Sequence, residues 1–415
     1  MTVSERGEPG RPPAGPAANL AELLAQRKIV VCVGSGGVGK TTTAAALALH
    51  AAKAGRRTIV CTIDPARRLA NALGLPQLDH TERRVPDEKL GGRPAPGGSL
   101  HAMMLDQKRA FDEVVARYAR DPAVLERILS NRIYQQVSSS LTGSLEYAAM
   151  AKLQALDRDD RFDLIVLDTP PTANALDFLD APRKLTDAID SPAIQWFIKP
   201  YMKAGRFSLK LIGRGGAFVL RRLGRFVGSQ FLEDIAQFLV EFNQVLGGFR
   251  ERAQEVFDLL RAPRVTFLLV CSPDPLAVDE AIFFFERLAG SQMPTGAFIV
   301  NRVHLAGGAC PAPEDVVARL AGRPELSALS PEEVARAARG LRENYQQFET
   351  LAAVDGAQIA RLRARCGSAQ PYVQVPFFDR DIYDTAGLGA IERHLFPSAV
   401  APAVTAAGPS SASRT

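Results

Sequence analysis

Residues 34–41 read Gly-Ser-Gly-Gly-Val-Gly-Lys-Thr and match the phosphate-binding pattern G-x-x-x-x-G-K-[ST]. An apolar, β-branched run at 28–33 precedes them, and an Ala/Leu-rich run at 42–49 follows. This order predicts a strand, a tight loop and a helix. Glycines let backbone N–H groups surround phosphate oxygens without Cβ clashes, and the N-terminus of the helix adds a partial positive charge. The chain is thereby constrained to an α/β fold in which one strand ends at a phosphate site.

Each position in this loop has an expected task. We expect Lys40 to reach the β- and γ-phosphates of a nucleoside triphosphate and the Thr41 hydroxyl to ligate Mg²⁺. The rest of the loop is expected to bind phosphate mainly through its backbone, at Gly34, Ser35, Gly36, Gly37, Val38, Gly39 and Thr42. The alternative is a glycine-rich turn that binds nothing.

The composition is that of an ordinary soluble protein, with 415 residues, 47% hydrophobic and 23% charged. The net charge of +5 does not by itself indicate a nucleic-acid partner. Five cysteines without a CxxC pair indicate a reducing compartment with no disulfide framework. The first 19 residues lack the apolar core of a signal peptide, and no apolar run reaches the roughly 20 residues of a membrane span. We therefore expect a cytoplasmic protein, at most peripheral at the inner face of a membrane.

Short apolar runs alternate with helical patterns along the chain. Their nearly continuous Val, Ile, Leu and Phe content is typical of strands buried on both faces of a mostly parallel sheet flanked by helices. The predicted strands lie at 29–33, 58–62, 100–105, 164–167, 265–271, 297–300 and 373–375. Residues 83–99 are predicted to be a Pro/Gly-rich loop and not a strand.

The domain prediction is a single P-loop ATPase domain at 20–397, carrying an inserted helical subdomain. Helical patterns without strand character mark the insertions, at about 107–160 and 183–262, with a further one at about 305–370. The two ends, 1–19 and 398–415, are rich in Ala, Pro, Gly and Ser and are predicted to be disordered tails.

Two aspartates follow predicted strands at the edge where the phosphate site should lie. Asp168 comes directly after an apolar run, and we expect it to hold Mg²⁺ through water. The alternative role for Asp168 is capping at an ordinary strand–helix turn. Asp64 ends another strand and either orients the attacking water or serves as the N-cap of a helix that begins with Pro65. From the residues alone, these two roles of Asp64 are equally supported.

Five dispersed motifs occur in the order of one known family. They are G-S-G-G-V-G-K-T-T, T-I-D-P-A-R-R-L-A, A-M-M-L-D, D-T-P-P-T-A-N-A-L-D-F-L and V-N-R. From residue 28 to 396 the chain resembles the arsenite-pump and tail-anchored-protein-targeting ATPases, the anion-transporting ATPases. It is most similar to a bacterial branch with D-P-A-[KR]-R-L and D-T-P-P switch motifs.

This resemblance implies roles for particular residues. Asp64 corresponds to the first-switch aspartate that positions the hydrolytic water, and Asp168 to the metal-side aspartate that opens the second switch. Asn301 resembles the residue that reads adenine, and Pro376 and Phe377 resemble the loop that packs beside the base. The segment 104–106 is similar to one near the nucleotide. The implied reaction is MgATP hydrolysis coupled to rearrangement of a dimer, either a homodimer or a heterodimer with a related ATPase.

The chain also departs from the family pattern. Ser35 stands where relatives carry a lysine that reaches the phosphates of the other subunit, a cation typically worth about 10³–10⁵ in rate. Ala173 and Asn174 replace the usual Gly-His of the second switch, and neither a zinc CxxC nor an arsenite-type cysteine triplet occurs. The departures favour either slow intrinsic hydrolysis, with the chain acting as an ATP-gated assembly module, or a partner that supplies the cation.

Residues 191–232 carry eight basic side chains and no acidic one, interleaved with apolar residues. A basic amphipathic helix of this kind binds a hydrophobic client or an anionic membrane surface. The alternative is a solvated basic face over an ordinary helical core, and the glycines at 205, 213, 215 and 216 interrupt a single helix. No nucleic-acid partner is expected, because the stretch lacks aromatic stacking platforms at single-strand spacing. A chromosome- or septum-positioning ATPase is disfavoured, because the second loop lysine is absent.

Overall fold

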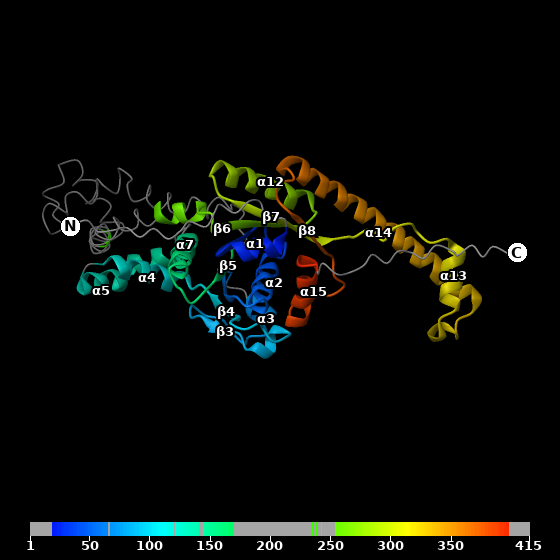
Figure 1. Ribbon diagram of the computed structural model, residues 1–415, viewed down its shortest axis with the longest axis horizontal. Helices are drawn as coiled ribbons and strands as arrows, with labels where there is room; N and C mark the ends of the chain where they lie inside the picture. The colour runs from blue at the N-terminus through cyan, green and yellow to red at the C-terminus, as the bar shows by residue number, and fades with distance from the viewer. Residues whose placement is uncertain are drawn as a thin grey trace, which may run out of the picture.

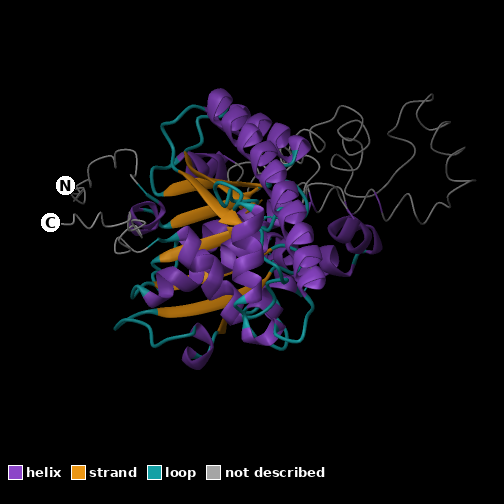
Figure 2. Cartoon of the chain, turned by 90° about the vertical axis from the view of Figure 1, so that its right-hand side faces the viewer, coloured by secondary structure: helices purple, strands orange, loops and turns teal. Residues whose placement is uncertain are grey.

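The computed structural model describes residues 19–64, 67–119, 121–140, 144–169 and 254–397, together with Ile235, Phe238 and Phe242. Its centre is an eight-stranded sheet in the order β3-β4-β2-β5-β1-β6-β7-β8. Figure 2 shows the strands side by side with helices packed over the sheet. The predicted fold class, an α/β protein with a mostly parallel sheet flanked by helices, is confirmed.

Every strand pair is parallel except the one at the β3 edge. The most central strands are uniformly buried because helices cover both faces of the sheet, and this explains their continuous apolar sequences. The strands are β1 (Ile29–Val33), β2 (Arg57–Thr62), β3 (Arg83–Arg84), β4 (Ser99–Met104), β5 (Leu164–Asp168), β6 (Val265–Cys271), β7 (Thr295–Val303) and β8 (Tyr372–Pro376).

The prediction that 83–99 contains no strand is wrong at its first two residues. Arg83 and Arg84 form β3, which pairs antiparallel with Ala102 and His101 of β4. Both arginines are exposed, and each is ion-paired to a nearby aspartate in its own segment, Asp79 or Asp87. A two-residue strand is too short to show the alternation that identifies strands in a sequence.

Helices cover the two faces of the sheet. α2 and α15 pack below it in the view of Figure 1, whereas α12 and α14 lie above it. The far end of α14 extends beyond the sheet and carries α13. The helices are α1 (Leu20–Gln26), α2 (Lys40–Lys53), α3 (Arg68–Ala72), α4 (Gln107–Tyr118), α5 (Pro122–Ser130), α6 (Arg132–Ser140), α7 (Ser144–Asp157), α12 (Pro275–Gly290), α13 (Pro313–Ala321), α14 (Pro331–Cys366) and α15 (Thr385–Leu395), with short 3₁₀ turns at Asp87–Leu90 and Pro324–Leu326.

The helices α4–α7 share a small core that is separate from the main one. It includes Phe111 of α4 and Tyr134 of α6, packed with Phe238 and Phe242 from much later in the chain. The Tyr134 hydroxyl donates a hydrogen bond of 2.6 Å to Asp112, which satisfies the polar end of a buried ring. Most of the other residues predicted as insertion at 183–262, and the whole basic stretch 191–232, lie outside the described residues.

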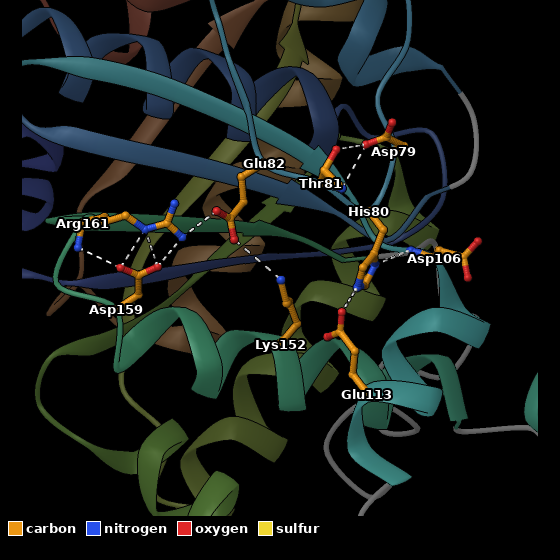
Figure 3. A network of polar contacts seen from close by, with 9 residues as sticks. All are labelled: Asp79, His80, Thr81, Glu82, Asp106, Glu113, Lys152, Asp159 and Arg161. Carbon is orange, nitrogen blue, oxygen red and sulfur yellow. Dashed lines mark hydrogen bonds and ion pairs between the residues drawn. The ribbon is translucent and has the colours of Figure 1, made fainter. Parts of the chain in front are cut away.

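A polar network joins the β3 edge of the sheet to α4 and α7 (Figure 3). Glu82 pairs with Lys152 of α7 at 3.7 Å and with Arg161 at 2.6 Å. His80 accepts a hydrogen bond from the backbone N–H of Asp106 at Nδ1 and contacts Glu113 of α4 through Nε2 at 3.0 Å. Because Nδ1 is an acceptor, Nε2 carries the proton and donates to Glu113. These contacts fix the start of α4 against the sheet.

Within the described residues, no helix combines the length and the apolar character needed to cross a membrane.

Candidate nucleotide site

The glycine-rich loop joins β1 to α2 in the predicted strand–loop–helix arrangement. β1 ends at Val33 and α2 begins at Lys40, which is 6% exposed. Lys40 Nζ donates to the Ser35 carbonyl at 2.8 Å, so the side chain folds back over its own loop. Burial lowers the pKa of Lys40, while the negative charge of Asp168 acts in the opposite direction. A phosphate oxygen fits here, because it would give this partly desolvated ammonium a charged partner in place of a carbonyl.

Two glycines in the loop are required by close contacts. A Cβ at Gly34 would lie 2.0 Å from the Val270 carbonyl oxygen of β6. Gly39 has φ +96°, and a Cβ there would lie 2.2 Å from Asn301 Nδ2. The Asn301 amide donates to the Val38 carbonyl at 2.9 Å. The loop is thus packed directly against β6 and β7, with no room for side chains at these positions.

Asp168 lies at the carboxyl end of β5, beside Cys32 of β1 and Thr62 of β2. It is fully buried, and its Oδ2 accepts a 2.8 Å hydrogen bond from the Thr62 hydroxyl. Burial raises the pKa of Asp168 to about 6, against the opposing effect of hydrogen bonds from Thr41 and Thr62 and the charge of Lys40. Its Oδ1 has no hydrogen-bond partner among the described residues.

The unpartnered oxygen of Asp168 lies in a set of groups that fits Mg²⁺. Mg²⁺ prefers hard oxygen ligands and keeps several waters, so it needs few protein groups. A buried carboxylate oxygen without a donor, together with the neighbouring Thr41 hydroxyl, supplies such groups. The residues therefore agree with the predicted metal position.

Asp64 follows β2 on the same edge of the sheet. Its backbone N–H donates to the Thr62 hydroxyl at 3.2 Å, and Arg68 Nη1 lies 3.9 Å from its Oδ2. Asp64 does not cap α3, because this helix begins at Arg68 with Arg67 as its N-cap. The Asp64 side chain instead lines the cavity described next.

A cavity of about 510 Å³ lies over the loop and extends to the ends of β7 and β8. It brings together most of the residues predicted for the site. The predicted residues that line it are Gly37, Gly39, Lys40, Thr41, Thr42, Asp64, Asn301, Pro376 and Phe377. Asp168 lies beside the cavity through its contact with Thr41, whereas Gly34, Ser35, Gly36 and Val38 form the loop behind or beside it. The Ser35 hydroxyl oxygen is buried and has no partner in the described part of the chain.

One segment implied by the resemblance, 104–106, does not line this cavity. Met104 lines a neighbouring cavity of about 220 Å³ together with Thr62 and Arg67. Asp106 serves as the N-cap of α4, accepting from the backbone N–H of Arg109. The structure thus gives these residues packing and capping contacts.

Sequence reasoning missed several side chains of the site. Thr62 holds Asp168, and the Thr169 hydroxyl donates to the Cys32 carbonyl at 2.8 Å while lining the cavity. The other unpredicted lining residues are Arg68, Arg302, Phe378, Arg380, Asp381, Ile382 and Ile391. The sequence could have indicated some of these residues by their position directly after a predicted strand, because side chains that follow parallel strands gather at one edge of the sheet.

Comparison with known proteins shows the family of the chain. The sequence profile of the family described as Anion-transporting ATPase matches residues 27–313. The chain belongs to the anion-transporting ATPase family. Over 293 residues it is 26% identical to the ATPase GET3 of Ajellomyces dermatitidis, covering 69% of this chain and 77% of that protein. The ATPase get3 of Aspergillus terreus is 25% identical over 271 residues, covering 65% of this chain and 71% of the relative.

Replacement of Gly34 by Ala is expected to destabilise the fold. The new Cβ would meet a backbone carbonyl of β6, which cannot move without disturbing the sheet. We expect a loss on the order of 3 kcal/mol in the free energy of unfolding, measured by urea titration. Gly37→Ala is the matched control, because Gly37 also has positive φ but no atom within 4 Å of its Cβ position. Gly37→Ala should lower the free energy of unfolding by only about 1–2 kcal/mol. Equal losses in the two variants would contradict the steric argument.

The raised pKa of Asp168 predicts a pH dependence of stability in the absence of metal and nucleotide. The folded state keeps this proton up to about pH 6, whereas an unfolded aspartate loses it near pH 4. The folded state therefore binds more protons between these values, and its stability falls as pH rises through this window. In EDTA, the free energy of unfolding of Asp168→Asn relative to wild type should rise by on the order of 2–3 kcal/mol as the pH increases from 3.5 to 7. A difference between the two proteins that does not change with pH would contradict this.

Proposed function

We propose that the chain binds MgATP and hydrolyses it to switch its conformation or dimer state. The observation that carries this proposal is the grouping of Lys40, Thr41, Asp64 and Asp168 at adjoining ends of α2, β2 and β5. Such a grouping supplies a phosphate-binding cation, a metal position and a carboxylate near the expected γ-phosphate. We take 20–397 as one ATPase domain with helical insertions, flanked by tails at 1–19 and 398–415.

In this proposal each residue has a distinct task. The loop N–H groups and Lys40 bind the phosphates, and Asp64 orients a water in line with the γ-phosphorus. The water oxygen forms a bond to that phosphorus as the bond to the β-phosphate oxygen breaks. Thr41 and Asp168 would hold Mg²⁺, the latter through water, and the ion supplies charge neutralisation at the β- and γ-phosphates. Asn301, Pro376 and Phe377 border the adenine side of the cavity.

The cellular role we propose follows from the family and from the sequence. A hydrophobic, membrane-associated or anionic transport client would bind through residues 191–232, with the protein in the cytoplasm or peripheral at the inner face of the membrane. Two chains, or this chain and a related ATPase, would assemble as a dimer. We assign the chain to a bacterial branch that lacks both the signature lysine and the zinc CxxC.

A second candidate function is an ATP-gated assembly module with little intrinsic hydrolysis. Ser35 favours it, because this position offers no charge to a neighbouring subunit, and its hydroxyl oxygen is buried without a partner among the described residues. ATP would then order the site and set the assembly without rapid turnover. The two candidates differ in the measured rate and not in the binding site.

Turnover measurements on three proteins test the hydrolysis proposal. Asp64→Asn should keep ATP binding but lose roughly 10²-fold or more in kcat, because the water loses its orienting carboxylate. Lys40→Ala should lose turnover and should also bind the triphosphate more weakly. Wild-type turnover no faster than that of Asp64→Asn, with ATP binding retained, would favour the assembly module. Absence of ATP binding by the wild type would overturn both candidates.

Introducing the missing cation provides a separate prediction. Ser35→Lys should raise turnover at least tenfold at concentrations where the protein dimerises, because a positive charge then reaches the phosphates of the neighbouring subunit. Ser35→Met is the matched control, since it adds length without charge. If both variants hydrolyse ATP at the wild-type rate, the slow step does not depend on a cation from this position.

A further inference from the structure

The adenine side of the cavity ends in an aromatic stack. Phe377 follows β8, is 55% exposed and lines the cavity. Its ring stacks on that of His304, with centroids 5.3 Å apart and an interplanar angle of 18°. The backbone N–H of Phe377 also donates to the Val303 carbonyl at 2.9 Å. An exposed ring has little packing to fix its rotamer, so the imidazole of His304 is an important restraint on its position.

His304 is in turn held by a buried carboxylate of α14. Asp355 Oδ2 accepts hydrogen bonds from the backbone N–H of His304 at 2.7 Å and from His304 Nδ1 at 2.9 Å. Asp355 is only 7% exposed, and both described donors to its side chain come from His304. A buried carboxylate is costly unless it is paired and hydrogen-bonded. The ring of Phe348, also on α14, packs edge-on against the imidazole at 5.4 Å.

The segment after His304 is attached to the same helix. The backbone N–H of Gly307 donates to Glu349 at 2.6 Å, and the Tyr345 hydroxyl donates to the Gly308 carbonyl at 2.9 Å. Upstream of His304, the β7–β8 pairing shifts register between Val300 and Val303. Arg302 there adopts φ +62°, a conformation that L residues rarely take. The chain is thus bent at the end of β7 and fixed along α14.

We propose that Asp355 and His304 are positioning residues that hold Phe377 as the wall against the nucleotide base. This inference rests on the proposed ATP site and adds the connection between that site and α14. The phosphate side of the cavity is built from β1, β2, β5 and α2 and does not depend on this pair.

Ligands with and without a base separate this role from a general structural one. We would measure dissociation constants for ATP, ADP and inorganic tripolyphosphate, each with Mg²⁺, by calorimetry. His304→Leu and Asp355→Ala should each weaken ATP and ADP about tenfold, since one well-placed ring contact is lost. Both should bind tripolyphosphate as the wild type does, and kcat at saturating ATP should change less than twofold.

Two further variants test the connection between the residues. His304→Phe keeps a ring against Phe377 and the backbone N–H that serves Asp355, so ATP affinity should stay within about threefold of wild type. The double variant with Leu at 304 and Ala at 355 should be no weaker for ATP than either single variant, because both act through the same stack. His80→Ala is the matched control. It breaks a comparable histidine–carboxylate contact at Glu113 and should leave all three affinities unchanged.

The outcomes separate this inference from the proposed function. Equal weakening of ATP and tripolyphosphate would show that the pair only supports the fold, and unchanged ATP affinity in His304→Leu would show that the stack does not matter. Either result overturns the inference while the ATP site stands. If wild-type protein binds tripolyphosphate as tightly as ATP, the base adds no affinity and the inference also fails. If it binds none of the three ligands, the proposed function fails first.

Discussion

The buried carboxylate of Asp168 is the interaction on which the geometry of the candidate nucleotide site depends most. It lies where β1, β2 and β5 end side by side, it accepts a hydrogen bond from the Thr62 hydroxyl, and the Thr41 side chain lies close to it. Its second oxygen has no donor in the described part of the chain. A carboxylate in this state is unfavourable in the folded protein, because burial disfavours its charged form and raises its pKa. The fold therefore holds an unfavourable buried charge at the position where a divalent cation would neutralise it.

The sheet divides the site between two sets of strands. β1, β2 and β5 present the groups suited to phosphate and metal, whereas β7 and β8 present an amide and an aromatic ring suited to a base. The loop after β1 touches both sets, because Gly34 contacts β6 and Gly39 contacts Asn301. The strands β2–β5 lie on one side of β1 and β6–β8 lie on the other. Open α/β sheets bind ligands at such a switch point. Tight packing at two glycines thus joins the two halves of the site.

The grouping of the residues proposed to bind phosphate could be predicted from sequence because its information is local. The loop pattern, and aspartates directly after apolar runs, identify Lys40, Asp64 and Asp168 as a group. Asn301 and Phe377 required family resemblance, since a single Asn or Phe after a strand has no distinctive pattern. Two features had no local signal. β3 is too short for periodicity, and the Asp355–His304 contact joins residues 51 positions apart on different elements. Only the folded arrangement of α14 against the end of β7 brings that pair together.

The length of α14 has a mechanical consequence. The helix spans 36 residues, and the part from Asp355 outward to Pro331 is roughly 36 Å long at 1.5 Å per residue. A rotation of the helix by about 5° around its anchor at Asp355 therefore displaces the outer end by about 3 Å, close to the rise of two residues. α13 packs on this outer end of α14 and would move with it. A small rotation of this helix would therefore be largest at α13, far from the cavity over the glycine-rich loop.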